Sequence, residues 1–166
     1  MNLSLKKYSL DKIGNYPFLK FTLIVFIISQ LISFTFGLIT DLTQINDISL
    51  SDKPGIREGN IYFQAIAMVI LAPILETIVF QFLPYITLIY FDFLKERKWL
   101  VITISALIFG FTHYYSPLYI LHTTCLGALF MYVYIMRQQK QDSLAVVCLV
   151  HILKNLTAFT LNLYML

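Results

Sequence analysis

One run of this sequence, Ile61–Tyr90, extends for 30 residues with a single charged side chain, Glu76. About 20 apolar residues in a helix are enough to cross the hydrocarbon core of a bilayer, which is roughly 30 Å thick. The whole chain is 58% hydrophobic and 13% charged, and that charged fraction is about half of what a soluble domain carries. The sequence therefore predicts an integral membrane protein.

Four other segments are apolar over a comparable length and are separated by polar or charged stretches: Phe21–Ile39, Trp99–His113, Leu118–Met136, and Ser143 to about Tyr164. Together the five runs predict an all-α fold, a polytopic membrane bundle of about five transmembrane helices. No internal repeat or second domain is visible. We expect residues 1–20 to form a cytoplasmic N-terminal segment and residues 21–166 a single transmembrane domain.

The first apolar run could be mistaken for a secretory signal, because four lysines precede it. It is longer than the apolar region of a typical signal peptide, and no site of the Ala-x-Ala type follows it. We expect it to remain as an uncleaved transmembrane helix. The run Ile61–Tyr90 is longer than a bilayer requires, so it must tilt, or break near Pro84.

The distribution of basic residues predicts an orientation. Nine of the 12 Lys and Arg residues lie before the first run, between the second and third, or between the fourth and fifth. Cytoplasmic loops are enriched in Lys and Arg, so the N-terminus should be cytoplasmic and the C-terminus outside. The net charge of +3 is small and gives no support to nucleic-acid binding. Cys125 and Cys148 fall within apolar runs and are expected to be reduced.

Ionisable groups in the middle of a bilayer cost at least about 2.5–3.5 kcal/mol, so they are seldom kept without a partner or a function. This chain places several polar side chains within its apolar runs: Glu76, His113, His122, His151, Lys154 and Asn155. His151 and Asn155 are four residues apart, which puts them on one helix face. Simpler interpretations exist for single members. Glu76 could be a structural partner of Lys154, and His122 is better explained as an interfacial or packing histidine.

Three short motifs occur in an order that resembles the CAAX-protease and bacteriocin-processing family, also called the Abi family. Residues 72–81, Ala-Pro-Ile-Leu-Glu-Thr-Ile-Val-Phe-Gln, resemble its first motif, Glu-Glu-x-x-x-Arg. Phe109-Gly110-Phe111-Thr112-His113 resembles the second motif, Phe-x-x-x-His, and His151-Ile152-Leu153-Lys154-Asn155 resembles the third, His-x-x-x-Asn. The resemblance covers residues 64–164.

The resemblance implies an intramembrane endopeptidase of the bacterial inner membrane. Its substrate would be a peptide or a prenylated or otherwise lipid-modified protein, and a role in bacteriocin self-immunity or processing is implied for bacterial members. Glu76 would be the general base, His113 would orient the water, and His151 with Asn155 would hold the carbonyl and its oxyanion. Glu76, His113 and His151 could also ligate zinc. A metal-free mechanism is favoured, because no His-Glu-x-x-His pattern is present.

Two positions depart from the first motif, since Thr77 replaces the second glutamate and Gln81 replaces the arginine. Losing both charges together is consistent with a lost ion pair, because losing one would leave an unpaired buried charge. We hypothesise that Lys154 supplies the missing cation to Glu76.

Three functional interpretations remain open: a glutamate-dependent endopeptidase, a non-catalytic relative that acts as an immunity or binding protein, and a proton-coupled or metal-translocating protein. Five helices without an inverted repeat argue against the third. Counting at 1.5 Å per residue places Glu76 near the middle of the membrane, His151 nearer the cytoplasm and His113 nearer the outside. The four site residues must nevertheless face one cavity if the enzyme interpretation is correct.

Overall fold

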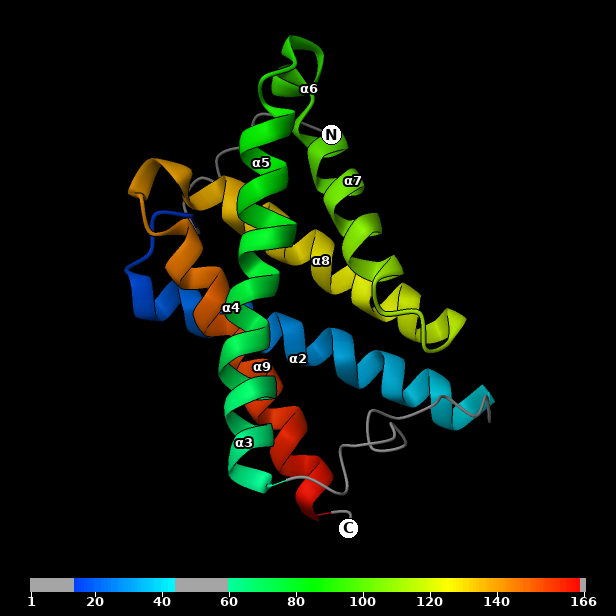
Figure 1. The fold of residues 1–166 in the computed structure, drawn as a ribbon. Helices are drawn as coiled ribbons and strands as arrows, with labels where there is room; N and C mark the ends of the chain where they lie inside the picture. Colours follow the sequence, from blue (N-terminus) through cyan, green and yellow to red (C-terminus); the bar gives the residue numbers. More distant parts are fainter. Residues whose placement is uncertain (1–13, 44–59, 165–166) are drawn as a thin grey trace.

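The computed structural model describes residues 14–43 and 60–164, and helices account for most of these residues, with no strand among them (Figure 1). In chain order the elements are α2 (Phe18–Thr43), α3 (Ile61–Ala65), η2 (Ile66–Leu71), α4 (Ala72–Thr77), η3 (Ile78–Phe82), α5 (Leu83–Leu88), α6 (Asp92–Glu96), α7 (Lys98–Phe111), α8 (Pro117–Arg137), η4 (Gln138–Lys140) and α9 (Ser143–Tyr164). The predicted all-α fold is confirmed.

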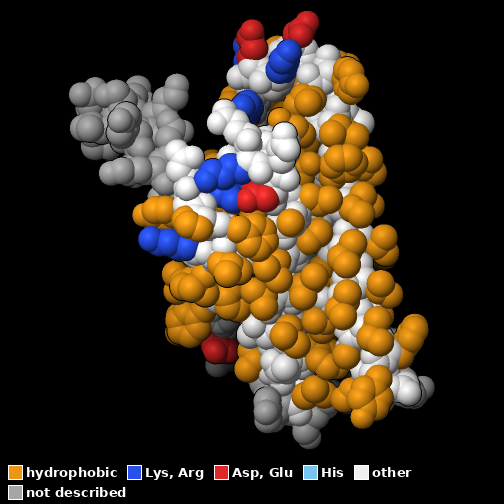
Figure 2. Space-filling view, turned by 90° about the vertical axis from the view of Figure 1, so that its left-hand side faces the viewer, with side chains coloured by type: hydrophobic (Ala, Val, Ile, Leu, Met, Phe, Trp, Pro, Cys, Tyr) orange, Lys and Arg blue, Asp and Glu red, His pale blue; other side chains and the backbone are white. Residues whose placement is uncertain are grey.

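Four helical segments are long and apolar enough to cross a membrane: Phe18–Thr43, Ile61–Leu88, Pro117–Lys140 and Ser143–Leu163. Large apolar side chains on them are exposed, such as Leu31 at 59% and Leu75 at 61%. In Figure 2 hydrophobic side chains cover most of the visible face, and most charged groups lie towards one end. This surface is suited to lipid and not to water, and the chain is an integral membrane protein.

The third predicted span, Trp99–His113, corresponds to α7, which has 14 residues and is shorter than the four spanning helices. At 1.5 Å per residue it is about 21 Å long, less than the roughly 30 Å of a hydrocarbon core. Figure 1 shows α7 and α8 as a hairpin whose turn lies at the side of the bundle. As a straight helix α7 therefore ends before it could span that core.

The long segment Ile61–Leu88 is one continuous helix. It contains two π-helical stretches, Ile66–Leu71 and Ile78–Phe82, and each ends two residues before a proline, Pro73 or Pro84. Proline has no N–H and its ring collides with the carbonyl four residues earlier, and a widened turn accommodates that ring without ending the helix. No break occurs near Pro84, so the alternative prediction, a tilt in the membrane, stays a prediction.

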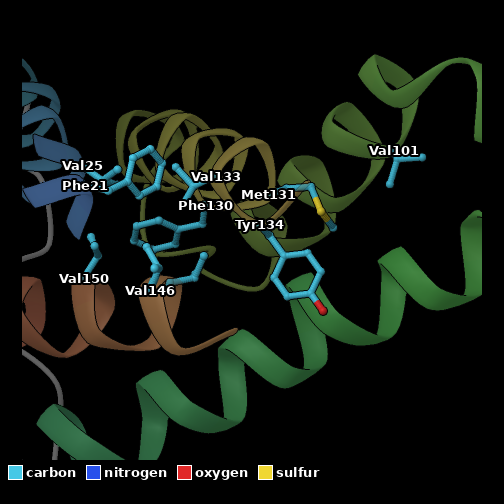
Figure 3. Close-up of a cluster of buried hydrophobic side chains, with 10 residues drawn as sticks. Phe21, Val25, Val101, Phe130, Met131, Val133, Tyr134, Val146 and Val150 are labelled. Atoms are coloured by element: carbon cyan, nitrogen blue, oxygen red, sulfur yellow. The ribbon is translucent and has the colours of Figure 1, made fainter. Parts of the chain in front are cut away.

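The apolar core lies where α2, α7, α8 and α9 meet (Figure 3). Phe130 and Met131 of α8 are at most 1% exposed and pack with Phe21 of α2 and Val146 of α9. At the α7–α8 contact, glycine lets the two backbones approach. A Cβ on Gly110 would lie 1.9 Å from Thr124 Oγ1, so this contact requires a residue without a side chain. Small residues serve this purpose in membrane helix pairs.

A second buried feature fastens the end of α8 to the N-terminal part of the described chain. The guanidinium of Arg137 is 1% exposed and forms a bidentate ion pair with Asp142. Its Nη1 donates to the backbone oxygens of Gly14 and Tyr16, each at 2.9 Å, and the ring of Phe21 lies 4.8 Å away. The chain preceding α2 and the α8–α9 turn therefore lie at the same end of the molecule. Residues 1–13 of the predicted N-terminal segment lie outside the described residues.

Candidate active site

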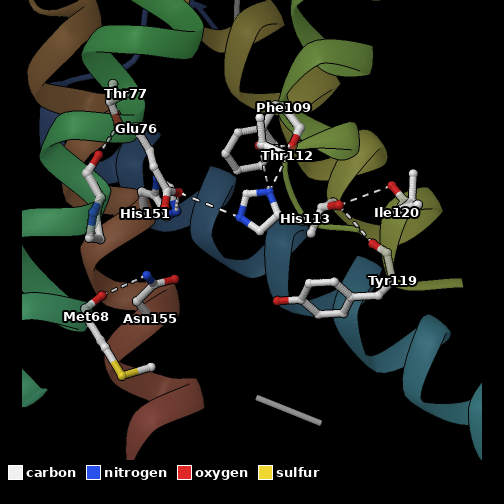
Figure 4. A network of polar contacts seen from close by, with 12 residues as sticks. Met68, Glu76, Thr77, Phe109, Thr112, His113, Tyr119, Ile120, His151 and Asn155 are labelled. Atoms are coloured by element: carbon white, nitrogen blue, oxygen red, sulfur yellow. Dashed lines mark hydrogen bonds and ion pairs between the residues drawn. The ribbon is translucent and has the colours of Figure 1, made fainter. Parts of the chain in front are cut away.

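A cavity of about 400 Å³ opens between α2, the long helix and the α7–α9 helices. Its volume falls within the range of pockets that hold small ligands. All four residues predicted for the site line it: Glu76, His113, His151 and Asn155. Figure 4 shows them on three separate helical segments, with their polar atoms directed towards a common space.

Glu76 lies in α4, between the two π-helical stretches. Its Oε2 is 3.4 Å from His151 Nε2 and 4.0 Å from His113 Nε2. The carboxylate is 27% exposed, so it is held in the wall of the cavity without being sealed off. π-helical turns are found disproportionately at functional sites. Here they flank the one turn that carries the carboxylate.

His113 lies two residues beyond α7, in the turn that leads to α8. Its Nδ1 donates a hydrogen bond to the carbonyl of Phe109 at 2.8 Å. A carbonyl only accepts, so Nδ1 carries the hydrogen, and this bond turns Nε2 towards Glu76. The mismatch in depth counted from the sequence disappears because α7 is short. The count assumed that each run crosses the full membrane, whereas α7 ends early and places His113 beside Glu76.

His151 is 5% exposed and its imidazole lies in an aromatic surround. The ring centroids of Phe130 and Phe109 are 5.0 and 6.0 Å from its own. Its Nδ1 is buried and has no hydrogen-bond partner, which leaves Nε2, beside Glu76, as the polar atom that faces the cavity. The aromatic walls fix the ring plane.

Asn155 lies one turn after His151, as their spacing predicted. Its Nδ2 donates to the backbone oxygen of Met68 in η2 at 2.9 Å, which ties α9 to the long helix (Figure 4). An amide nitrogen has two hydrogens, and this bond uses one of them. The cavity face of α9 follows helical periodicity over its whole length: His151, Lys154, Asn155, Ala158, Phe159 and Asn162.

The structure adds a second polar group to the same cavity, which we call the Ser33 cluster and which consists of Ser33, His122 and Lys154. The ammonium of Lys154 donates to Ser33 Oγ at 2.5 Å, and Ser33 Oγ is 2.9 Å from His122 Nε2. His122 does pack, with ring centroids 5.1 Å from Phe36 and 5.9 Å from Tyr119. The sequence missed Ser33, which precedes the resembling motifs, although a serine repeated at positions 29 and 33 of an apolar helix was a signal.

The hypothesis that Lys154 pairs with Glu76 is not supported by these contacts. The hydrogen bond of Lys154 is made to α2, whereas the carboxylate of Glu76 lies beside the two histidines. The other departures from the first motif are both buried. Thr77 and Gln81 are 0% exposed. Thr77 donates to the backbone oxygen of Pro73 at 2.7 Å, and both polar atoms of the Gln81 amide are without a hydrogen-bond partner.

Metal binding was considered for Glu76, His113 and His151. Within residues 14–43 and 60–164, no group of three or more His, Cys, Asp or Glu side chains is arranged to hold a metal ion. The two nitrogen–oxygen distances to Glu76 are 3.4 and 4.0 Å. The metal-free mechanism stays a prediction.

Comparison with known proteins adds one match. A family model described as type II CAAX prenyl endopeptidase Rce1-like matches residues 58–157, which is more than half of the 166-residue chain. The matched region contains all four predicted site residues and two of the three members of the Ser33 cluster. No curated protein and no solved structure gives a significant match.

Proposed function

Because the chain belongs to the Rce1-like family of type II CAAX prenyl endopeptidases, we propose that it is a glutamate-dependent intramembrane endopeptidase. The observation that carries this proposal is the placement of Glu76. Its Oε2 lies within 4.0 Å of two imidazoles, one on α9 and one in the turn after α7, at the wall of a cavity in the bundle. This arrangement provides a base, two groups that orient it, and a space for a substrate.

Glu76 acts as the general base. A water molecule loses a proton to the carboxylate, its oxygen bonds to the scissile carbonyl carbon, and the carbonyl π electrons move onto oxygen. When the tetrahedral intermediate collapses, the C–N bond breaks and the protonated Glu76 returns the proton to the leaving amine. General acid–base catalysis of this kind contributes about 10²- to 10⁴-fold to the rate.

His113 positions the attacking water. The 4.0 Å between its Nε2 and Glu76 Oε2 is longer than a direct hydrogen bond and allows both atoms to contact one water. The bond from Nδ1 to Phe109 leaves Nε2 of the neutral ring as an acceptor. Nε2 of His113 therefore accepts a hydrogen bond from one hydrogen of the water, which stays on the water oxygen, while Glu76 removes the other as a proton.

His151 and Asn155 stabilise the oxyanion. Each presents an N–H group to the cavity, from Nε2 of His151 and from the second hydrogen of Asn155 Nδ2. Two contacts hold these donors in place before substrate arrives, the aromatic surround of His151 and the Met68 carbonyl that holds Asn155. Removing one such donor costs about 10²- to 10³-fold in turnover.

The substrate in this proposal is a membrane-associated peptide or protein carrying a prenyl or other lipid group, and cleavage would serve processing or bacteriocin self-immunity. The protein would lie in a bacterial inner membrane with its N-terminus in the cytoplasm. The contacts of Arg137 with Gly14 and Tyr16 are consistent with that orientation, because they bring two of the basic segments to one end. The reactivity of cysteines introduced at Asn15 and Gln141 towards an impermeant maleimide tests the orientation, since both should be protected in intact cells.

A non-catalytic relative that binds a peptide is the second candidate, and the buried pair of departures from the motif favours it. Thr77 and Gln81 carry no charge, so any ion pair that supports the glutamate in other members is absent here. A binding protein would keep the cavity and would tolerate the loss of the base.

The decisive measurement is cleavage of a fluorogenic, S-farnesylated CAAX peptide by the purified protein in nanodiscs. Glu76→Gln keeps the shape of the side chain and removes the base, so it should lower turnover at least 100-fold. Glu96→Gln is the matched control, because Glu96 is exposed in α6, and it should behave as wild type. Equal turnover for Glu76→Gln and wild type would refute the proposed peptidase. Biological activity that survives in Glu76→Gln would favour the binding protein.

A further inference from the structure

Lys154 is a cation inside a spanning helix, and it forms no ion pair with a carboxylate among the described residues. Among the described residues, the carboxylates that lie within 4.0 Å of a basic side chain are Glu76, beside His113 and His151, and Asp142, beside Arg137. The hydrogen bond of Lys154 goes to a neutral hydroxyl, Ser33 Oγ. A buried charge without a counter-charge is costly. Its retention at the wall of a ligand-sized cavity points to an anion that arrives from outside.

The Ser33 cluster converges from three helices, with Ser33 on α2, His122 on α8 and Lys154 on α9, and all three line the cavity that holds Glu76. An ammonium has three hydrogens, and Ser33 uses one of them. The other two are available to a ligand. A lysine joined to a hydroxyl and an imidazole is a suitable partner for a carboxylate, which accepts several hydrogen bonds at once.

The position of Lys154 relative to the proposed site sets the ligand. Lys154 lies three residues after His151 on the same face of α9, a rise of about 4.5 Å. A peptide of three residues spans at most about 10 Å when extended. The resemblance to CAAX proteases implies that a C-terminal tripeptide is removed, and in such a substrate the terminal carboxylate can reach Lys154 while the scissile carbonyl lies beside Glu76.

We propose that the Ser33 cluster is a subsite for the C-terminal α-carboxylate of the substrate. Lys154 supplies the charge, and Ser33 with His122 holds the ammonium in place. The proposal rests on the proposed function for the identity of the substrate. Such a subsite would make cleavage selective for bonds near a free C-terminus. A peptide bond close to a C-terminal carboxylate is positioned beside Glu76, whereas an internal bond of a longer chain is not.

Binding tests this without cleavage. A fluorescently labelled, S-farnesylated CAAX peptide is prepared with a free C-terminal acid and as the C-terminal amide, which has the same shape and no charge. Both are titrated by fluorescence anisotropy against the Glu76→Gln protein in nanodiscs of neutral phosphatidylcholine. The acid should bind roughly 10- to 100-fold more tightly than the amide, as a charge-assisted hydrogen bond allows.

The same ratio is measured after substitution of the cluster. In the Glu76→Gln background, Lys154→Met should reduce the acid-to-amide ratio to about 1 by weakening the acid alone, and Lys154→Arg should keep most of it. Lys98→Met removes an exposed lysine at the start of α7 and should leave the ratio unchanged. A general structural defect would weaken both peptides and would not change their ratio.

The outcomes separate this inference from the proposed function. If the ratio persists in Lys154→Met, or neither peptide binds, the subsite is refuted, and cleavage by the wild-type protein can still stand. If the ratio depends on Lys154 but wild-type protein cleaves nothing, the subsite stands and the peptidase does not. If anionic phosphatidylglycerol in the nanodisc abolishes the preference for the acid, the cluster holds a lipid phosphate and the inference fails.

Discussion

Two cations within the helix bundle, the buried Arg137 and the partly buried Lys154, differ in how completely their charge is neutralised. Arg137 is enclosed at one end of the bundle, where a carboxylate, two backbone oxygens and an aromatic ring surround the guanidinium. Lys154 lies at the wall of the cavity and has one neutral hydroxyl as its hydrogen-bond partner among the described residues. Both are charges within a largely apolar molecule, and a charged side chain without a polar partner in such a place costs free energy.

The difference distinguishes a structural charge from a functional one. A buried ion pair contributes little net stability but is costly to break from one side. A cation that lacks an anionic partner in the folded chain contributes to binding when a ligand supplies one. By this reasoning the contacts of Arg137 stabilise the fold, and Lys154 contributes to the binding of a substrate. Removing each charge should therefore have opposite consequences for stability and binding.

The largest effect is expected at the satisfied charge. Arg137→Met leaves Asp142 without its cation and the oxygens of Gly14 and Tyr16 without a donor, and should lower the free energy of unfolding by about 3–5 kcal/mol. Titration of the detergent-solubilised protein with SDS measures this loss. Arg97→Met, which removes an exposed arginine, should change it by no more than about 0.5 kcal/mol. A small effect of Arg137→Met would remove the contrast between the two regions.

The contrast itself could not be derived from the sequence. Arg137 and Lys140 were predicted to mark a loop on the cytoplasmic side, and nothing in their spacing indicated that Arg137 would be buried against residues more than 120 positions earlier. Lys154 was recognised as unusual because it interrupts an apolar run, but its partner was assigned to Glu76. Local pattern identifies a residue that needs a partner, and only the packing of helices decides which partner it meets.

The site was more predictable than the contacts that support it. The apolar runs set the helices, and the three motifs identified Glu76, His113, His151 and Asn155, which the structure brings to one cavity. The depth of His113 was misjudged because hydropathy gives the length of an apolar run and not where its helix ends. The π-helical turns around Glu76 were also missed, although the prolines that accompany them were visible in the sequence.

The second prediction concerns the contact between α7 and α8 at Gly110. Gly110→Ala places a Cβ against Thr124 Oγ1 and the Ile120 carbonyl, so it should lower the free energy of unfolding by about 1–3 kcal/mol. It should also lower peptide cleavage, because Gly110 follows Phe109, whose carbonyl oxygen accepts the hydrogen bond that orients His113. Gly37→Ala is the matched control, since a Cβ there meets nothing within 4 Å. Equal effects of the two substitutions would show that the contact does not position the site.

The third prediction has the opposite sign and concerns Gln81, whose amide is buried without a partner. Gln81→Met has a similar shape and no group to satisfy, and should raise the free energy of unfolding by about 1 kcal/mol. Thr77→Val removes a hydroxyl that is bonded to Pro73 and should lower it by about 0.5–1.5 kcal/mol. A loss of stability in Gln81→Met would mean that the amide does have a hydrogen-bond partner. The buried Gln81 side chain would then stabilise the fold, as the buried Arg137 side chain does.

The smallest effect on stability is expected at Lys154, and it is the one that separates the two cations most sharply. Lys154→Met removes a charge that no carboxylate of the described chain neutralises, while Ser33 and His122 still have each other at 2.9 Å. Replacing a poorly compensated buried charge by an apolar side chain is often neutral or stabilising, so the free energy of unfolding should change by less than about 1 kcal/mol. The same SDS titration measures it, with Arg137→Met run in parallel. A loss as large as that of Arg137→Met would show that Lys154 is also a structural cation, whose charge stabilises the fold without waiting for a ligand.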